Sequence, residues 1–224
     1  MARRITAVDA IARRKGIHPK LAAKQYLRLT ESSALAGRFA GDHLRRSLEG
    51  FLFPSTYELF ERDTAARLVS DQIAAFREEW RRVDLRYARS KNLTPYDVLI
   101  TASMIEAEVR VPRERPLVAA VIYNRLHAHM PLGIDATIRY GLGIPPTQAI
   151  KESQLRSSSP YNTRNRLGLP PTPIDNPGLA SMQAAAHPAK VKYLYFVRKA
   201  DCRSHFFTAS VQAFLDYPRS GLRC

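Results

Sequence analysis

The sequence has few cysteines and no long apolar run. Cys202 and Cys224 are its only cysteines, and no CxxC pair or Cys/His cluster accompanies them. These spacings disfavour a zinc site. The two thiols either form a disulfide that fastens the C-terminal tail in an oxidising compartment, or they remain free. No uncharged stretch approaches the roughly 20 apolar residues that span a bilayer, and the start of the chain lacks the apolar core of a signal peptide.

Acidic side chains are also scarce relative to basic ones. The 224 residues carry 35 Lys and Arg against 20 Asp and Glu, a formal net charge of +15. Such a balance favours polyanionic surroundings, namely nucleic acid, anionic lipid or an acidic wall polymer, and does not choose among them. With 45% hydrophobic residues the chain can bury a core. As given, it is expected to be soluble, either by itself or as the soluble part of a longer protein.

Helical patterns dominate the chain. Two short helices are expected within 5–29, a rigid aromatic turn at 48–60, and a long basic amphipathic helix from 63 to about 89. Thr94, Pro95 and Asp97 predict the start of a further helix, and others are expected at 115–130, 179–188 and 209–217. The alternating segment 191–199 predicts a strand that pairs with 204–208. The expected fold class is α+β, helix-dominated, with a small antiparallel sheet.

Two glutamates, Glu106 and Glu108, lie at the end of the helix that Thr94 begins. Residues two apart on a helix point about 200° away from each other, so the two side chains flank the apolar stripe on opposite sides. One can be buried or catalytic while the other forms an ion pair, for which the candidates are Arg110, Arg113 and Arg115. The alternative is that both belong to a surface ion-pair cluster.

A constrained polar loop, residues 157–178, favours a functional role for one of them. It contains "SSSPYNTRNRLGLPPTPIDNPG", in which prolines are combined with many hydrogen-bonding side chains. A rigid polar wall of this kind suits a groove for a sugar polymer. A glutamate that projects into such a groove beside apolar neighbours would have a raised pKa and could serve as a general acid.

An ordered series of motifs resembles a known family. The motifs are "EGFLFPSTYEL", "ASMIEAE", "ERPLVAAVIYNRL", "MPLGIDATIRYGLG", "SPYNT", "GLPPTPIDNPGLASMQAAAHPAKVKYLYFV" and "SHFF". They resemble those of the MltG (YceG-like) endolytic murein transglycosylases, in the same order, from about residue 48 to 208. Ile134 and Ala136 stand where the family commonly has serine and proline, Arg164 where it has an aromatic, and "ADCRS" where it has a glycine-rich turn.

The resemblance implies an activity and a catalytic residue. Family members cleave the bond between N-acetylmuramic acid and N-acetylglucosamine without water, leave a 1,6-anhydromuramic end and so terminate growing strands. The essential glutamate maps to Glu108, with Glu106 as the second choice. No cofactor or metal is expected. The expected substrate-binding residues are Asn124, Asp135, Tyr140, Ser159, Tyr161, Asn162 and Thr163.

Several roles within this site are left open by the residues. Asp135 is expected to bind sugar, brace the loop or cap the following turn, and across a cleft from Glu108 it would allow lysozyme-like hydrolysis. His205 is expected to be structural more often than a base. Arg125 is expected to form an internal ion pair, with Glu106 as the candidate partner. Tyr140 and Tyr161 are equally compatible with sugar stacking and with packing.

The resemblance also implies an organisation and a setting. Residues 1–47 are expected to be the helical N-terminal portion of a truncated YceG-like domain, 48–216 the catalytic domain and 217–224 a tail. Peptidoglycan strands are the expected partner, cell-wall synthases are candidates, and nucleic acid is not expected. The setting is the outer face of the cell membrane, reached through an anchor that this chain lacks. The alternatives are a catalytically silent glycan-binding module and a charge-driven nucleic-acid-binding protein, although the latter leaves 157–178 unexplained.

Overall fold

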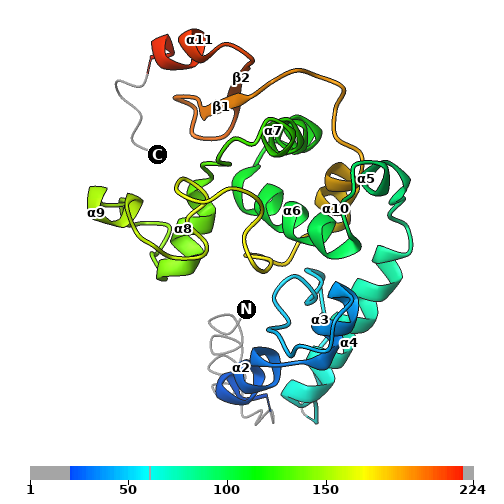
Figure 1. The fold of residues 1–224 in the computed structure, drawn as a ribbon. Helices are drawn as coiled ribbons and strands as arrows, with labels where there is room; N and C mark the ends of the chain where they lie inside the picture. The colour runs from blue at the N-terminus through cyan, green and yellow to red at the C-terminus, as the bar shows by residue number, and fades with distance from the viewer. Residues whose placement is uncertain (1–20, 61, 219–224) are drawn as a thin grey trace. The chain divides into compact units, whose positions relative to one another are not determined.

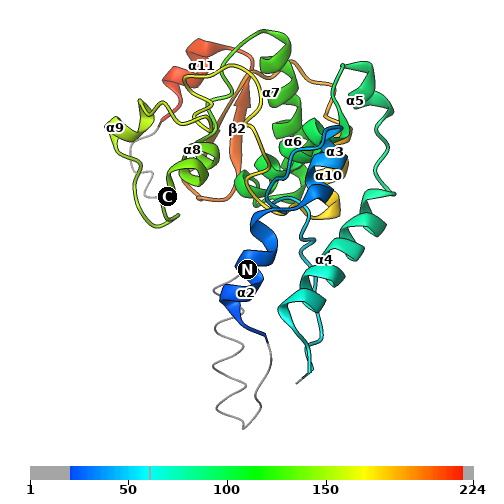
Figure 2. The ribbon, with the colours of Figure 1, turned by 60° about the horizontal axis from the view of Figure 1, so that its bottom comes forward.

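The computed structural model describes residues 21–60 and 62–218, and the chain divides into two compact units, Met1–Arg82 and Val83–Cys224. Helices prevail in both units, and the second also holds a small sheet (Figures 1 and 2). The α+β class with a small antiparallel sheet is therefore confirmed. The functional division at residues 47 and 216 stays a prediction. The helix expected near residue 5 and Cys224 lie outside the described residues.

In its described residues the first unit packs α2 (Ala23–Glu31), α3 (Ala34–Ala40) and α4 (Ala65–Trp80) together. Tyr26 of α2 donates a hydrogen bond of 2.8 Å to the buried Gln72 of α4. An aromatic cluster with edge-to-face contacts fills the core, and its members are Phe39, Phe51, Phe76 and Trp80. Gly37 is required because a Cβ there would lie 1.9 Å from the carbonyl oxygen of Leu44.

The second unit is built around α6 (Pro95–Glu108). Thr94 and Asp97 form a reciprocal capping box at its start, and Pro95 occupies the first turn, as the sequence predicts. Its neighbours are α7 (Arg115–His127), α8 (Asp135–Leu142) and α10 (Leu179–Ala186). All residues from Val98 to Ile105 are buried. The sequence predicted a single narrow apolar stripe, and the helix is instead enclosed on all sides.

Shorter elements complete the second unit. They are α5 (Arg86–Ser90), the 3₁₀ turn η1 (Pro112–Glu114), α9 (Glu152–Leu155) and α11 (Val211–Asp216). β1 (Tyr195–Arg198) and β2 (His205–Thr208) form the antiparallel hairpin expected from the sequence, with Arg198 opposite His205. In Figure 1 the hairpin lies beside α7. Among the described residues, none of the helices combines the length and apolar character needed to cross a bilayer.

The prediction of one long helix from 63 to about 89 is wrong, because the structure has two separate helices there. α4 ends at Trp80, and α5 begins only at Arg86. Between them, Asp84 accepts hydrogen bonds from the backbone N–H and the guanidinium of Arg86. A side chain that caps a new turn in this way competes with continuation of the helix, although the amphipathic pattern runs through the break.

Candidate active site

The side chain of Glu108 ends α6 in a mostly buried position, with only 11% of it exposed. Its Oε1 accepts a hydrogen bond of 3.2 Å from the backbone N–H of Ala136, in the first turn of α8. The N–H groups of a first helical turn have no partner within the helix, and they carry the positive end of the helix dipole. The carboxylate is therefore held by the start of α8.

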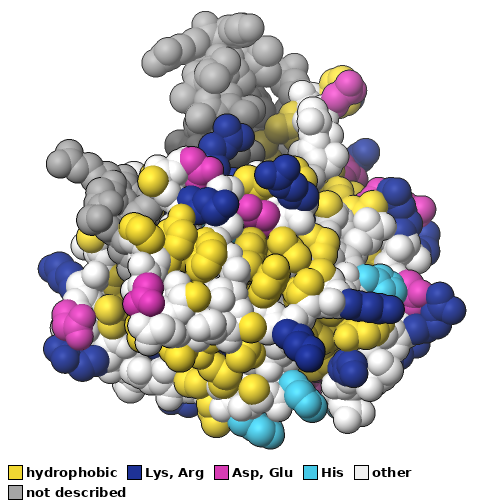
Figure 3. All heavy atoms as spheres, turned by 90° about the horizontal axis from the view of Figure 1, so that it is seen from above, with side chains coloured by type: hydrophobic (Ala, Val, Ile, Leu, Met, Phe, Trp, Pro, Cys, Tyr) yellow, Lys and Arg dark blue, Asp and Glu magenta, His cyan; other side chains and the backbone are white. Residues whose placement is uncertain are grey.

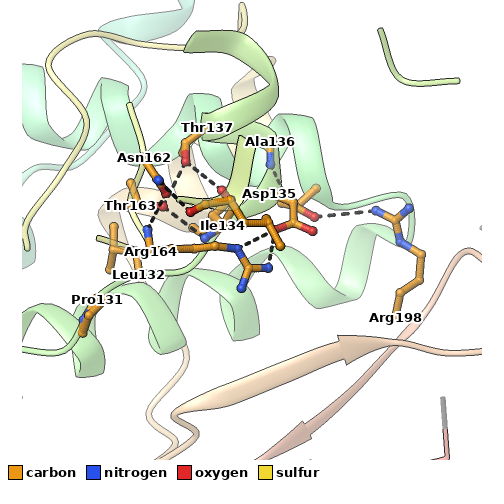
Figure 4. A network of polar contacts seen from close by, with 12 residues as sticks. Pro131, Leu132, Ile134, Asp135, Ala136, Thr137, Asn162, Thr163, Arg164 and Arg198 are labelled. Carbon is orange, nitrogen blue, oxygen red and sulfur yellow. Dashed lines mark hydrogen bonds and ion pairs between the residues drawn. The ribbon is translucent and has the colours of Figure 1, made fainter. Parts of the chain in front are cut away.

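A second positive group approaches Glu108 from the hairpin. The Nη2 atom of Arg198, the last residue of β1, lies 3.6 Å from Glu108 Oε2. Figure 4 shows Arg198 reaching from the strand towards the start of α8, where Ala136 and Asp135 lie. Burial raises the pKa of Glu108, and the Ala136 N–H and the Arg198 charge offset this only in part. Glu108 therefore holds its proton to a higher pH than an exposed glutamate.

Glu106 has a different set of partners on the opposite side of α6. Its Oε2 accepts hydrogen bonds from the backbone N–H of Gly178, at 3.2 Å, and from the hydroxyl of Ser181, at 2.6 Å. Arg115 lies 4.0 Å from its Oε1 and donates to Ser181. Glu106 thus caps the start of α10. Of the three arginines that were candidates for an ion pair, Arg115 is the one found.

The ion pair expected between Arg125 and Glu106 is wrong. Arg125 instead donates to three backbone carbonyl groups, those of Leu194, Pro131 and Leu132. Its guanidinium also lies 5.1 Å from the centre of the Tyr195 ring. Arg125 therefore fastens the segment before β1 to the loop before α8, and its guanidinium donates to backbone carbonyl groups instead of pairing with a carboxylate.

Asp135 lies at the start of α8, directly before the residue that binds Glu108. Its Oδ1 accepts two hydrogen bonds from Arg164, at 3.1 and 2.5 Å, and about half of its side chain is exposed. Figure 4 shows the contact between Arg164 and Asp135. Asp135 thus braces the constrained loop, one of the roles that the sequence left open. Its charge also raises the pKa of Glu108.

The "SPYNT" segment packs closely against α8. A Cβ on Gly141 would lie 2.6 Å from the Cβ of Tyr161, and the rings of Tyr140 and Tyr161 are 5.1 Å apart. The Tyr161 hydroxyl shares a hydrogen bond of 2.7 Å with Thr172, and Ser159 accepts one from the Tyr161 N–H. The segment is thus held in one conformation, as the sequence predicts for this loop.

Two of the expected substrate-binding residues in this segment are buried. Asn162 donates to the carbonyl groups of Leu155 and Ser157, and Thr163 contacts Thr137 and the N–H of Ile134. Figure 4 shows Asn162 and Thr163 beside the start of α8. Direct contact of either with a sugar would require the loop to open. Their placement favours a bracing role.

Asn124 lies apart from this segment, on α7. Its amide donates to the carbonyl groups of Val191 and Tyr193, so both of its protons fix the segment that leads into β1. Asn124 therefore lies at the base of the hairpin, whereas the structure brings the other six together around α8: Asp135, Tyr140, Ser159, Tyr161, Asn162 and Thr163. Sugar contacts stay a prediction for all seven residues.

His205 forms a buried pair with Glu114. Its Nδ1 lies 2.8 Å from Glu114 Oε2, and its backbone N–H donates to Glu114 Oε1 at 3.1 Å. Both side chains are almost fully enclosed. His205 thus anchors β2 to η1, which agrees with the structural role that the sequence favoured. Glu114 and Arg198 were missed, although the predicted pairing of 191–199 with 204–208 brings Arg198 close to His205.

Known proteins resemble this chain in sequence and in structure. The profile of the YceG-like family matches residues 3–219. An endolytic murein transglycosylase of Bacillus subtilis is 34% identical over 159 residues, 71% of this chain and 44% of that protein. One from Streptococcus pneumoniae is 36% identical over 159 residues, 68% of this chain and 28% of that protein. The chain spans less than half the length of these curated relatives.

A solved structure agrees with the fold. The crystal structure of a YceG-like protein from Listeria monocytogenes superposes with a TM-score of 0.71 and 26% sequence identity. The superposition covers 94% of this chain and 72% of that one.

Proposed function

Because the chain belongs to the YceG-like family, we propose that it is a lytic transglycosylase that cleaves peptidoglycan glycan strands within their length. The relatives from Bacillus and Streptococcus bear the name endolytic murein transglycosylase. The observation that carries the proposal is the environment of Glu108, a mostly buried carboxyl with a raised pKa between α8 and the hairpin. A general acid needs such a carboxyl.

In the proposed reaction Glu108 acts twice. Protonated, it gives its proton to the oxygen that joins N-acetylmuramic acid to N-acetylglucosamine, and the bond from that oxygen to the anomeric carbon breaks. Ionised, it then takes the proton of the muramic 6-hydroxyl, whose oxygen bonds to the anomeric carbon. The products are a 1,6-anhydromuramic end and a free 4-hydroxyl, and water is not consumed.

The surroundings of Glu108 fit both halves of this cycle. Burial favours the protonated acid before cleavage, whereas the Ala136 N–H and the Arg198 charge stabilise the carboxylate after it. One carboxyl is then sufficient. Asp135, the candidate second carboxylate of a hydrolase, is held by Arg164. Since peptidoglycan lies outside the cytoplasmic membrane, the proposed site of action is its outer face.

The first test is mass spectrometry of un-crosslinked glycan strands after incubation with the parent, Glu108→Gln and Glu106→Gln. We expect anhydromuramic ends from the parent and a loss of at least about a hundredfold in Glu108→Gln. Per folded molecule, Glu106→Gln should retain activity because its partners belong to α10. Reducing ends would instead indicate a hydrolase and implicate Asp135. Binding without cleavage would indicate a glycan-binding module.

A further inference from the structure

Arg198 has unused hydrogen-bonding capacity beside the proposed acid. Its guanidinium carries five N–H donors, and 31% of the side chain is exposed. Within 21–60 and 62–218, the only polar partner found for this guanidinium is Glu108, and the separation of 3.6 Å exceeds a normal hydrogen bond. A partly exposed guanidinium with free donors can bind a further anion.

The neighbouring arginines do not share this property. Arg125, on α7, donates to the carbonyl groups of Leu194 and Leu132, and Arg164 donates to Asp135. Arg139, on α8, donates to the carbonyl groups of Pro145 and Gln148. Each of these three has a structural partner already. Arg198 is therefore the better candidate for contact with a ligand.

The backbone position of Arg198 is also fixed by contacts of the hairpin with η1. Its backbone pairs with His205 across the hairpin, and both the ring and the backbone N–H of His205 are held by Glu114. Glu114 belongs to η1, six residues after Glu108 in the chain. The hairpin therefore presents the guanidinium next to the acid without needing a ligand to order the backbone. Prior organisation of this kind lowers the entropic cost of binding.

We propose that Arg198 binds a carboxylate of the glycan strand next to the bond that is cleaved, and that it thereby determines which strands are substrates. This inference rests on the proposed function. A planar guanidinium binds a carboxylate through two parallel hydrogen bonds, a geometry that an ammonium group cannot reproduce. Muramic residues offer two sources, the lactyl carboxylate of peptide-free strands and the carboxylates of stem peptides.

Capture of a substrate carboxylate would also act on Glu108. The ionisable groups that face Glu108 are Arg198 from β1, Asp135 from α8 and His205 from β2. When Arg198 is neutralised by a substrate anion, its attraction for the ionised form of Glu108 weakens. Glu108 then retains its proton to a higher pH and is ready to donate it. A strand without the carboxylate would leave Arg198 directed at Glu108.

The test compares four proteins on three substrates. The proteins are the parent, Arg198→Gln, Arg198→Lys and Arg203→Gln, the last a matched control in which an exposed arginine of the same hairpin loses the same charge. The substrates are peptide-bearing strands, peptide-free strands, and strands whose carboxylates are converted to primary amides. Thermal melting of each variant verifies folding, and kcat and KM are measured across a range of pH.

We expect Arg198→Gln to lower kcat/KM about ten- to hundredfold on strands that carry the recognised carboxylate. On amidated strands its loss should be clearly smaller, because there the variant lacks only the Arg198 charge beside Glu108. Arg198→Lys should recover part of the loss. Arg203→Gln should show no loss on any strand. A loss confined to peptide-bearing strands would identify a stem-peptide carboxylate, and a loss confined to peptide-free strands would identify the lactyl group. An equal loss on amidated strands, or no loss on any strand, overturns the inference.

A binding measurement separates this inference from the proposed function. Labelled strands are titrated with Glu108→Gln and with the double variant Glu108→Gln/Arg198→Gln. If the parent produces no anhydromuramic ends, the proposed function fails, while weaker binding of native strands by the double variant still supports carboxylate recognition. If the parent cleaves and the two variants bind native and amidated strands alike, the proposed function stands and the inference fails.

Discussion

Glu106 and Glu108 lie two residues apart at the end of α6, in opposite electrostatic environments. Glu106 accepts two hydrogen bonds at the start of α10 and lies 4.0 Å from Arg115. Glu108 is more deeply buried, and burial raises its pKa despite the Ala136 N–H and Arg198. The hydrogen bonds of Glu106 stabilise the start of α10, whereas the ionised form of Glu108 destabilises the fold.

These environments predict stability changes of opposite sign. An unfolded chain releases the Glu108 proton near pH 4.3, about the ordinary value for glutamate, whereas the folded protein retains it to a higher pH. Stability is therefore lost as pH rises through the folded pKa. We expect Glu108→Gln to raise Tm at pH 7 by roughly 2–4 °C, and to leave it unchanged near pH 4. Thermal melting followed by circular dichroism measures both.

Glu106→Gln is the matched control on the same helix. It removes the same charge, weakens the cap of α10 and should lower Tm at pH 7 by a similar amount. If both variants shifted Tm in the same direction at pH 7, the two glutamates would not differ in the way that their contacts indicate.

At the scale of elements, a buried contact with η1 anchors the second strand of the hairpin. Replacing Glu114 by Ala leaves the ring and the backbone N–H of His205 without their acceptor in an enclosed position. We expect a loss of about 2–4 kcal/mol in the free energy of unfolding. Hydrogen exchange should accelerate at 195–198 and 205–208 more than in α6.

Glu114→Gln provides the control because its amide oxygen can still accept one of the two hydrogen bonds. It should weaken the hairpin less than Glu114→Ala. Unchanged exchange in the hairpin of the Ala variant, with the same global stability as the parent, would show that Glu114 does not anchor it.

Elements whose signals are local were predictable from the sequence. Thr94, Pro95 and Asp97 lie within four residues and specify the start of α6 together. The strands of the hairpin follow from their alternation. The break between α4 and α5 was not predictable in this way, because one aspartate side chain overrides an amphipathic pattern that continues on both sides.

The partners of the site residues depend on contacts between distant parts of the chain. The motif around Glu108 indicated an acid, but Arg198 lies 90 positions further along the sequence. No periodicity links the two residues. The enclosure of α6 on all sides likewise arises from the later helices α7, α8 and α10. A pattern within α6 alone could indicate only one apolar face.

At the scale of the whole molecule, the net charge of +15 attracts polyanions at long range, in addition to the local contacts of the site. Lys and Arg side chains are spread over the face seen in Figure 3, among hydrophobic ones, and are not gathered into one stripe. Charge dispersed in this way favours approach of an anionic strand without fixing its register. Register would then come from a specific contact such as that proposed for Arg198.

Salt should therefore separate the two contributions. The Debye length falls from about 10 Å at 0.1 M to about 3 Å at 1 M, which screens dispersed surface charges far more than a mostly buried pair 3.6 Å apart. On strands with free carboxylates we expect KM to rise at least about fivefold over this range, while kcat changes by less than about twofold. Steady-state release of anhydromuramic ends measures both constants.

Amidated strands are the control, because they present no carboxylate charge to the basic surface. Their KM should change little between 0.1 and 1 M salt, provided that thermal melting shows the protein folded at both concentrations. An equal rise of KM on native and amidated strands would mean that the excess of positive charge plays no part in strand capture. A fall in kcat on native strands without a rise in KM would instead place the salt-sensitive contact at Glu108 itself, because only the step that moves the proton would then be screened.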